Sequence, residues 1–418
     1  MISSVIRVST LLIGVAFLLT GHGLQLALIP LRAELFEWSS LALGVLGSAY
    51  FAGFLLGCFS IPRLVSRIGH VRCFATLSAL LTASILALAL LETFALWFVL
   101  RFIAGIAISG LYLVIESWLN EMAENDVRGG VLGIYTAIVL VALAIGQLLL
   151  NVAPLEGDKL FIIAASLIAL AGIPICVTRA AQPVQIPSAT FSPLLIVDTS
   201  RAAAVSALIA GMVTSVYYAM GPAWGLQVGM EIRDISSMMA LGIIGGAVTL
   251  LPLGRFSDRR DRRLVILTIM LLGAVFAVFA AFAPVTIAPY LMFVFGGCIM
   301  PIQALSLAHA SDNIENRSFL EVGTGLLVMN ASGAIVGPLV AALAMQSFGS
   351  RAFFLFNAVV LAFGGLLVLV MIRSRNPTRE HFAKFQVMTT ATAQGALQLD
   401  PRTDPETQQE QDPLQQNQ

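Results

Sequence analysis

The sequence predicts an all-α membrane protein in which twelve transmembrane helices form two pseudo-symmetric six-helix bundles. Composition is the first reason, because 58% of the 418 residues are hydrophobic and only 11% are charged, whereas soluble domains carry about 25% charged residues. The second reason is a series of long apolar runs along the chain. The third is a polar loop that recurs 192 residues further on. Together these features exclude a soluble globular domain.

The apolar runs have the length that a membrane requires. A helix needs about 20 residues to cross ~30 Å of hydrocarbon, and only helices or closed barrels satisfy their backbone groups in lipid. No alternating strand pattern of the barrel type is present. The predicted spans are 8–30, 40–62, 72–92, 95–119, 130–152, 159–178, 201–228, 235–253, 264–283, 286–308, 318–346 and 350–372.

Two polar stretches divide the chain into parts. Residues 179–200 contain Pro183, Pro187 and Pro193 and are expected to link a first half, 1–178, to a second half, 201–373. Residues 374–418 are rich in Gln, Thr, Pro and acidic residues and have too few apolar residues for a core. We therefore expect a disordered tail.

Positive charge is distributed unevenly between the predicted loops. Arg32, Lys159, Arg233 and Arg351 fall on one side of the membrane and Arg101 within a span, while the other Lys and Arg residues fall on the side of the termini. Because basic residues favour the cytoplasmic side, both termini are expected to be cytoplasmic. The net charge of zero gives no reason to expect nucleic-acid binding.

The loop after the second span resembles the loop after the eighth. Arg63 aligns with Arg255 and Arg67 with Arg259, each at an offset of 192 residues. At nearly the same offset, span four aligns with span ten (Gly105 over Gly297) and span five with span eleven (Gly146 over Gly337). Two halves with parallel topology are typical of secondary transporters.

These loops carry a recognisable motif. The second copy resembles the G-x-x-x-D-R-x-G-R-R signature of the major facilitator superfamily at Gly254, Asp258, Arg259, Arg262 and Arg263, with Asp261 in place of the second glycine. The first copy is degraded, since Pro62 and Ser66 replace the leading Gly and the Asp, but Arg67 and Gly69 remain. The resemblance implies that these loops form a latch between the halves. The alternative is that they only orient the chain and contact anionic lipid.

Further motifs extend the resemblance to residues 1 to about 375. Arg101 and Gly105 are similar to an R-x-x-x-G motif in span four, and the stretch from Arg101 to Tyr135 resembles the YcaD-like branch. The glycine motifs of spans five and eleven resemble those that allow close helix packing; they comprise Gly133, Gly146, Gly333, Gly337 and Pro338.

Arg101 is the most informative single residue. A charged side chain within a span is costly and usually faces a cavity, although snorkelling to the surface is an alternative. The resemblance implies that this arginine tunes a proton carrier or binds negative charge on the substrate. Glu116 lies fifteen residues further along, about 22 Å down the same helix. Its alternatives are a structural pairing with Arg67 or Arg128 and a proton site.

Other polar residues lie deep within predicted spans. The resemblance implies that spans one, four, seven and ten line a cavity, whereas each residue alone is equally compatible with an interhelical hydrogen bond. His22 is a further candidate for proton coupling, because imidazole titrates near neutral pH. The set suggests a neutral or weakly charged solute, and it comprises His22, Gln25, Tyr112, Tyr217, Tyr218, Gln303 and Asn330.

We therefore expect a proton-coupled secondary transporter of a small organic solute in the bacterial inner membrane, with efflux slightly favoured over uptake of a polar nutrient. A receptor on the same fold is the alternative from another class, and it would depend on the tail. No HExxH, GxSxG or GxxxxGK[ST] constellation supports an enzyme or an ATPase. No catalytic residue, metal or cofactor is predicted, and a monomer is expected.

Overall fold

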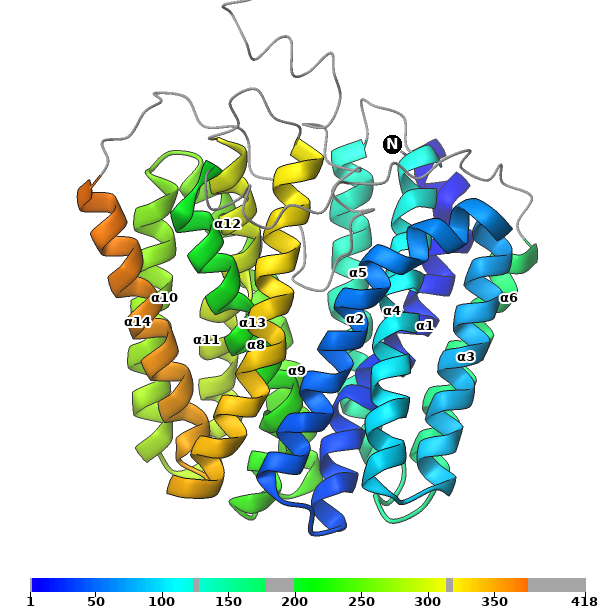
Figure 1. Cartoon of the computed structure of the whole chain (residues 1–418), viewed down its shortest axis with the longest axis horizontal. Coiled ribbons are helices and arrows are strands. Elements are labelled where there is room, and N and C mark those ends of the chain that lie inside the picture. Colours follow the sequence, from blue (N-terminus) through cyan, green and yellow to red (C-terminus); the bar gives the residue numbers. More distant parts are fainter. Residues whose placement is uncertain (1, 123–127, 178–198, 313–318, 375–418) are drawn as a thin grey trace, which may run out of the picture.

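The computed structural model describes residues 2–122, 128–177, 199–312 and 319–374. Within these ranges the chain is almost entirely helical (Figure 1). The predicted linker and tail lie almost wholly outside the described residues. The α-helices are α1 (Ile2–Leu35), α2 (Ser40–Ile68), α3 (His70–Leu90), α4 (Phe94–Met122), α5 (Arg128–Leu148), α6 (Lys159–Val177), α8 (Arg201–Gln227), α9 (Ile232–Ser257), α10 (Arg262–Phe282), α11 (Ala288–Ile299), α12 (Pro301–Ser311), α13 (Phe319–Phe348) and α14 (Ala352–Ser374).

The helices have the length and polarity of membrane spans. Eleven stretches of the described chain are long and apolar enough to cross a bilayer, and α6 supplies a shorter apolar helix at the position of the predicted sixth span. Large apolar side chains such as Val275 and Phe279 of α10 are more than half exposed, as expected where lipid rather than water surrounds a helix. The predicted all-α membrane fold is confirmed.

The tenth span differs from its prediction as a single helix. It comprises a short 3₁₀ turn (Val285–Ile287), α11 and α12, with a break at Met300. Pro301 has no N–H, so the carbonyl of Gly297 loses its intrahelical donor. The hydroxyl of Thr249 in α9 donates to that carbonyl at 2.8 Å. A neighbouring helix therefore satisfies the backbone at the break.

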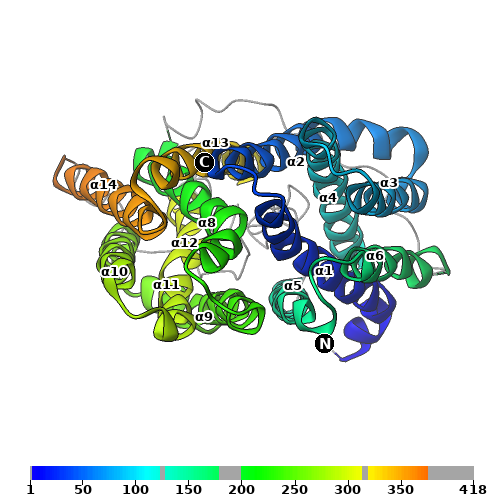
Figure 2. The same ribbon diagram turned by 90° about the horizontal axis from the view of Figure 1, so that it is seen from below.

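The predicted internal repeat is visible in the packing of the two halves (Figure 2). A Cβ atom on Gly53 of α2 would collide with the carbonyl of Phe102 in α4, and one on Gly245 of α9 would collide with the carbonyl of Phe293 in α11. Each contact brings two helix backbones together at a glycine. The expected alignment of Gly105 with Gly297, however, is wrong.

The partner of Gly105 in the repeat is Gly296 rather than Gly297. A Cβ on Gly105 would meet the carbonyl of Tyr50, and one on Gly296 would meet the carbonyl of Gly242. Tyr50 and Gly242 are 192 residues apart, whereas Gly105 and Gly296 are 191 apart. The offset therefore shortens by one residue between the second and fourth helices of each half.

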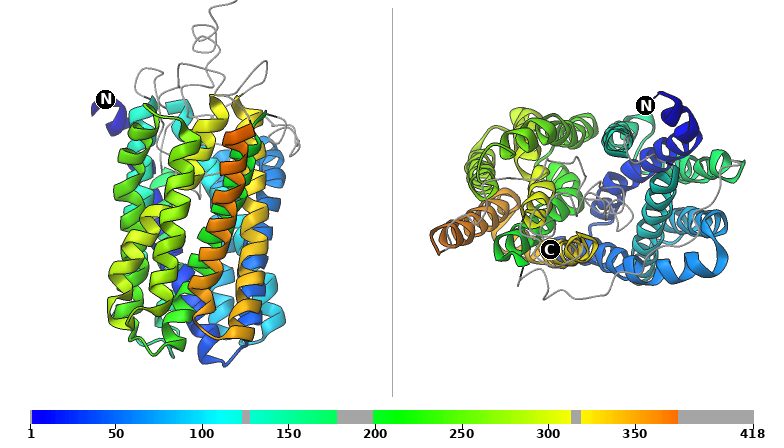
Figure 3. Two further views of the ribbon diagram at one scale, coloured as in Figure 1. Left: turned by 90° about the vertical axis from the view of Figure 1, so that its left-hand side faces the viewer. Right: turned by 90° about the horizontal axis from the view of Figure 1, so that it is seen from above.

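The two halves pack together mainly toward one face of the bundle. We call the end that holds the N-terminus the N-terminal face, and the other end, which holds the α1–α2 connection, the opposite face (Figure 1). The ribbons of the halves converge toward the opposite face and separate toward the N-terminal face (Figure 1). Seen from the N-terminal face, the two halves form two separate groups of helices (Figure 3, right). Helix α2 packs on α13, α5 on α9 and α1 on α8 across the junction.

Small residues and hydrogen bonds hold this junction. A Cβ on Gly44 of α2 would lie 2.5 Å from the Cβ of Ala342 and 2.6 Å from the carbonyl oxygen of Pro338 in α13. One turn further along α2, the hydroxyl of Ser48 donates to the carbonyl of Ile335 at 2.6 Å. The junction is therefore a close contact between backbones, and side chains of ordinary size would force it apart.

Candidate functional site

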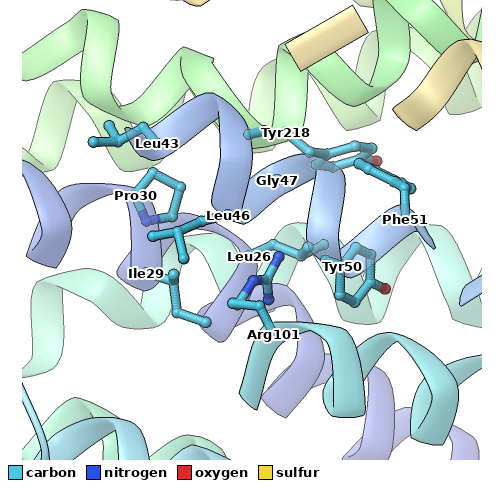
Figure 4. Close-up of a pocket in the computed structure, with 11 residues that line it drawn as sticks. Leu26, Ile29, Pro30, Leu43, Leu46, Gly47, Tyr50, Phe51, Arg101 and Tyr218 are labelled. Atoms are coloured by element: carbon cyan, nitrogen blue, oxygen red, sulfur yellow. The ribbon is translucent and has the colours of Figure 1, made fainter. Parts of the chain in front are cut away.

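A small cavity lies between the two halves. Helices α1, α2 and α4 of the first half and α8 of the second half line it (Figure 4). Its lining is mainly apolar with a few polar side chains, as in sites that bind small organic molecules. Its lining residues are Leu26, Ile29, Pro30, Leu43, Leu46, Gly47, Tyr50, Phe51, Arg101, Tyr218 and Ala219.

Arg101 supplies the charge in this lining. Its side chain is buried, and its guanidinium carbon lies 4.4 Å from the centre of the Tyr50 ring. Neither Nε nor Nη1 of Arg101 has a hydrogen-bond partner among the described residues. The face of an aromatic ring attracts a cation, so Tyr50 partly compensates a charge that no carboxylate in the described part of the chain neutralises.

Tyr50 also connects this charge to the imidazole of His22. The tyrosine hydroxyl lies 3.2 Å from Nε2 of His22, and Nδ1 of His22 lies 2.8 Å from the side-chain amide of Gln25. The direction of each hydrogen bond depends on the histidine tautomer and on the orientation of the amide. His22 thus has a polar partner at each ring nitrogen, and these two contacts fix the orientation of the ring.

Tyr50 is not among the site residues predicted from the sequence. It lies in the second span, which the family resemblance did not place among the cavity-lining helices. The signal that could have found it is positional: Tyr50 falls three residues before Gly53, at the closest approach of α2 and α4. The backbone of Phe102, the residue after Arg101, contacts Gly53, and the backbone of Tyr50 contacts Gly105, so Tyr50 and Arg101 belong to the same helix crossing.

The structure separates the two tyrosines of α8. Tyr218 lines the cavity, whereas the buried hydroxyl of Tyr217 donates to the backbone carbonyl of Met239 in α9. Gly242 provides the space, since a Cβ there would lie 2.5 Å from the Tyr217 hydroxyl. Consecutive residues on a helix point about 100° apart, so one tyrosine faces the cavity and its neighbour packs between helices.

Tyr112 and Glu116 lie further along α4 and are absent from the cavity lining. Both are buried. The hydroxyl of Tyr135 in α5 donates to a carboxylate oxygen of Glu116 at 3.1 Å, while the hydroxyl of Tyr112 has no hydrogen-bond partner among the described residues. The first half therefore contains a second polar region closer to the N-terminal face.

Gln303 and Asn330 form a pair in the second half. The amide nitrogen of Asn330 donates to the side-chain oxygen of Gln303 at 3.1 Å and lies 3.3 Å from the carbonyl oxygen of Ala207. These contacts join α13 to α12 and α8. Neither residue belongs to the lining of the cavity, so the structure does not bring them together with Arg101.

The predicted latch residues lie at the N-terminal face. Arg262 is buried and pairs with Asp258 at 3.0 Å and with Asp312, the residue that follows α12, at 2.7 Å. These ion pairs lie within the second half. Arg63 and Arg67 of the first copy are exposed, and Gly69 ends α2 with a positive φ of 84°. Arg259 follows Asp258 in the turn between α9 and α10.

Asp261, the residue that departs from the motif, caps α10. Its carboxylate accepts from the backbone amide of Arg263 at 2.9 Å and from the guanidinium of the same residue at 2.8 Å. Burial raises the pKa of Asp261, but these hydrogen bonds and the charge of Arg263 outweigh it and leave the pKa below its ordinary value. The carboxylate is therefore ionised at neutral pH.

The predicted packing glycines fall into two groups. Cβ atoms on Gly105, Gly146, Gly333 and Gly337 would meet the backbone of a neighbouring helix, as close packing requires. Pro338 lies at the junction between the halves, where it faces α2. Gly133 differs, because a Cβ there would meet nothing within 4 Å in the part of the chain that the structure describes. Its expected packing role is corrected accordingly.

Comparison with known proteins agrees with this architecture. The sequence profile described as Major Facilitator Superfamily matches residues 11–327 and 202–405. An uncharacterized MFS-type transporter of Enterobacter sp. (strain 638) is 27% identical over 370 residues, which cover 88% of this chain and 96% of the relative. The uncharacterized MFS-type transporter YcaD of Salmonella newport (strain SL254) is 28% identical over 377 residues, 88% of this chain and 97% of the relative.

Solved structures share the fold at low sequence identity. The nucleoside transporter NupG has a TM-score of 0.74 at 14% identity and covers 87% of this chain and 99% of its own. A bacterial homolog of the human lysosomal transporter Spinster, in an inward-facing and unoccupied conformation, has a TM-score of 0.74 at 13% identity, covering 90% and 99%.

The expected resemblance to the YcaD-like branch is thus confirmed by relatives that match along nearly their whole length. The profile match spans both six-helix halves, and the helices of the two halves repeat as this fold requires. The chain belongs to the major facilitator superfamily and is a membrane transporter, not an enzyme.

Proposed function

We propose that this chain moves a small organic solute by proton-coupled alternating access, with the cavity around Arg101 as the solute site and efflux as the direction. The observation that carries the proposal is the position of the cavity. Three helices of the first half and α8 of the second half line it. A solute bound there contacts both halves, so rocking of the halves can transfer it from one face to the other.

The packing of the halves supports a defined state in this cycle. Contacts such as Ser48 with Ile335 and Asn151 with Ser236 lie toward the opposite face. The distribution of Arg and Lys residues favours a cytoplasmic N-terminal face. We therefore assign the structure to a state closed toward the outside. In this state Asp258 pairs with Arg262 within the second half, and we propose that Asp258 contacts the first half in the other state, as a latch requires.

His22 is our candidate for the proton carrier. It lies between Gln25 and Tyr50, and Tyr50 contacts Arg101 in the cavity. A change in the protonation of His22 would alter the hydrogen bond of the tyrosine that supports the charged residue. Proton binding and solute binding would thereby be linked through one side chain, as coupled transport requires.

The test uses membrane vesicles of both orientations. Everted vesicles, acidified inside by respiration, are incubated with a library of small organic solutes, and the solutes retained are measured by mass spectrometry. Proton-coupled efflux predicts accumulation that requires the protein, is abolished by a protonophore and is lost in His22→Gln. The matched control is His70→Gln, because His70 bonds Ser117 away from the cavity.

Each alternative gives a different result. Accumulation only in right-side-out vesicles would indicate uptake, as a nutrient symporter requires. Accumulation that persists with a protonophore would contradict proton coupling. If no solute distributes differently between vesicles with and without the protein, the transport proposal fails.

A further inference from the structure

We propose that the solute is an organic monoanion, with a carboxylate or similar group paired to Arg101 and an apolar body held by the rest of the cavity. The inference rests on the function proposed above and specifies the chemical class of its substrate. It starts from a difference between Arg101 and the other buried arginines that the structure describes.

Among the residues that the structure describes, three of the four buried arginines have acidic partners. Arg32 pairs with Glu92, Arg262 with Asp312 and Asp258, and Arg263 with Asp261. Arg101 is as buried as these, yet its guanidinium contacts the Tyr50 ring, and its Nε and Nη1 have no acceptor among the described residues. A buried charge without a counter-ion is costly, so a bound anion would supply the missing partner.

The internal repeat shows that the fold does not require a charge at this position. Gly105 of α4 corresponds to Gly296 of α11, so Arg101 corresponds to Met292, which is fully buried. The second half thus packs an apolar side chain where the first half carries a guanidinium. Methionine fills this position in the second half, so helix packing alone does not require an arginine at the same position of the first half.

The other residues that line the cavity indicate which chemical groups the rest of the ligand can carry. No acidic residue lines the cavity, so nothing described there favours a cation. Leu26, Leu43 and Leu46 give apolar walls on the side of α1 and α2 (Figure 4). One guanidinium matches one negative charge, and the apolar walls match a hydrocarbon or aromatic body. Tyr218 adds a polar ring from the second half, so the ligand would contact both halves.

The experiment compares three probes that share one skeleton. Thermal unfolding of the purified full-length protein is measured in detergent at pH 7.5 with 3-phenylpropionate, 3-phenylpropanamide or 3-phenylpropylamine at millimolar concentrations. The carboxylate is expected to raise the unfolding temperature by at least about 2 °C. It should bind at least about tenfold more tightly than the amide or the amine, because only the carboxylate forms charge-assisted hydrogen bonds with Arg101.

Two variants assign the effect to the site. Arg101→Met, which copies the residue of the second half, should lose the response to the carboxylate. Arg233→Met removes an exposed arginine of α9 outside the cavity and should keep it. The comparison of the three probes on the unaltered protein stands by itself if Arg101→Met does not fold.

Several outcomes would overturn the proposal. They are equal stabilisation by the carboxylate and the amide, preference for the amine, no stabilisation by the carboxylate, or an unchanged response in a folded Arg101→Met. Binding is measured here without a proton gradient or a membrane. A carboxylate response without transport would reject the proposed function alone, and transport of cations or neutral solutes would reject the substrate class alone.

Discussion

The face and the hydroxyl of Tyr50 contact different partners. The guanidinium carbon of Arg101 lies 4.4 Å from the centre of the ring, while the hydroxyl lies 3.2 Å from Nε2 of His22. One side chain thus joins the charge in the cavity to an imidazole outside its lining. Substitutions that remove the two contacts separately can therefore distinguish solute binding from proton coupling.

Tyr50→Phe should separate these roles. The ring and its contact with Arg101 remain, but the hydrogen bond to His22 is lost. We expect binding of 3-phenylpropionate to change less than about threefold, while the pH dependence of transport shifts. Binding is measured by thermal unfolding and transport in everted vesicles between pH 6 and 8.

Tyr50→Leu is the companion variant, since it removes the ring and the hydroxyl together. It should weaken carboxylate binding as well as change the pH profile. An identical pH profile in Tyr50→Phe and the unaltered protein would show that the contact with His22 has no part in coupling.

Gly44→Ala should shift the balance between the two access states. The added Cβ would lie 2.5 Å from the Cβ of Ala342 and 2.6 Å from the carbonyl oxygen of Pro338, so the halves cannot pack as closely toward the opposite face. We expect labelling of Ile29→Cys in the cavity, by an impermeant maleimide added at the opposite face, to increase several-fold. The native cysteines are first replaced by serine.

Gly172→Ala in α6 is the matched control, because a Cβ there meets nothing within 4 Å among the described residues. Its labelling should equal that of the parent protein. Equal labelling in Gly44→Ala and Gly172→Ala would mean that the α2–α13 contact does not control access.

Gly105→Ala and Gly133→Ala should affect stability in opposite directions. At Gly105 the new Cβ collides with the carbonyl of Tyr50, and overpacking of this kind typically costs about 1–3 kcal/mol. At Gly133 the space is free among the described residues, and replacing a helical glycine by alanine typically stabilises by roughly 0.5–1 kcal/mol. Unfolding curves in detergent measure both changes, and a loss at Gly133 as large as that at Gly105 would contradict the structure.

Asp312→Asn should destabilise the protein more than Asp258→Asn. Both carboxylates pair with Arg262, but the Asp312 side chain is 5% exposed and that of Asp258 is 24% exposed. A hydrogen bond to a charged group in a buried site contributes about 1.5–3 kcal/mol, whereas a partly exposed ion pair contributes up to about 1 kcal/mol. The free energy of unfolding in urea measures the difference, and the reverse order would show that Asp258 is the main partner.

Much of the architecture could be predicted from the sequence. The thickness of the bilayer sets the length of an apolar run, so the spans were found from composition alone. The repeated loops at Arg63 and Arg255 revealed the two halves, and Arg101 was identifiable because a charge within a span is costly. These inferences depend on properties of short segments, which do not change when the helices pack.

The tertiary structure alone decided which polar side chains meet. Tyr217 and Tyr218 are adjacent in the sequence, but the space left by Gly242 directs Tyr217 between helices and leaves Tyr218 at the cavity. Tyr50 comes to Arg101 because Gly53 lets α2 approach α4 at that level. The rotation and height of each helix depend on contacts with residues far away in the chain, and a pattern within one segment does not contain that information.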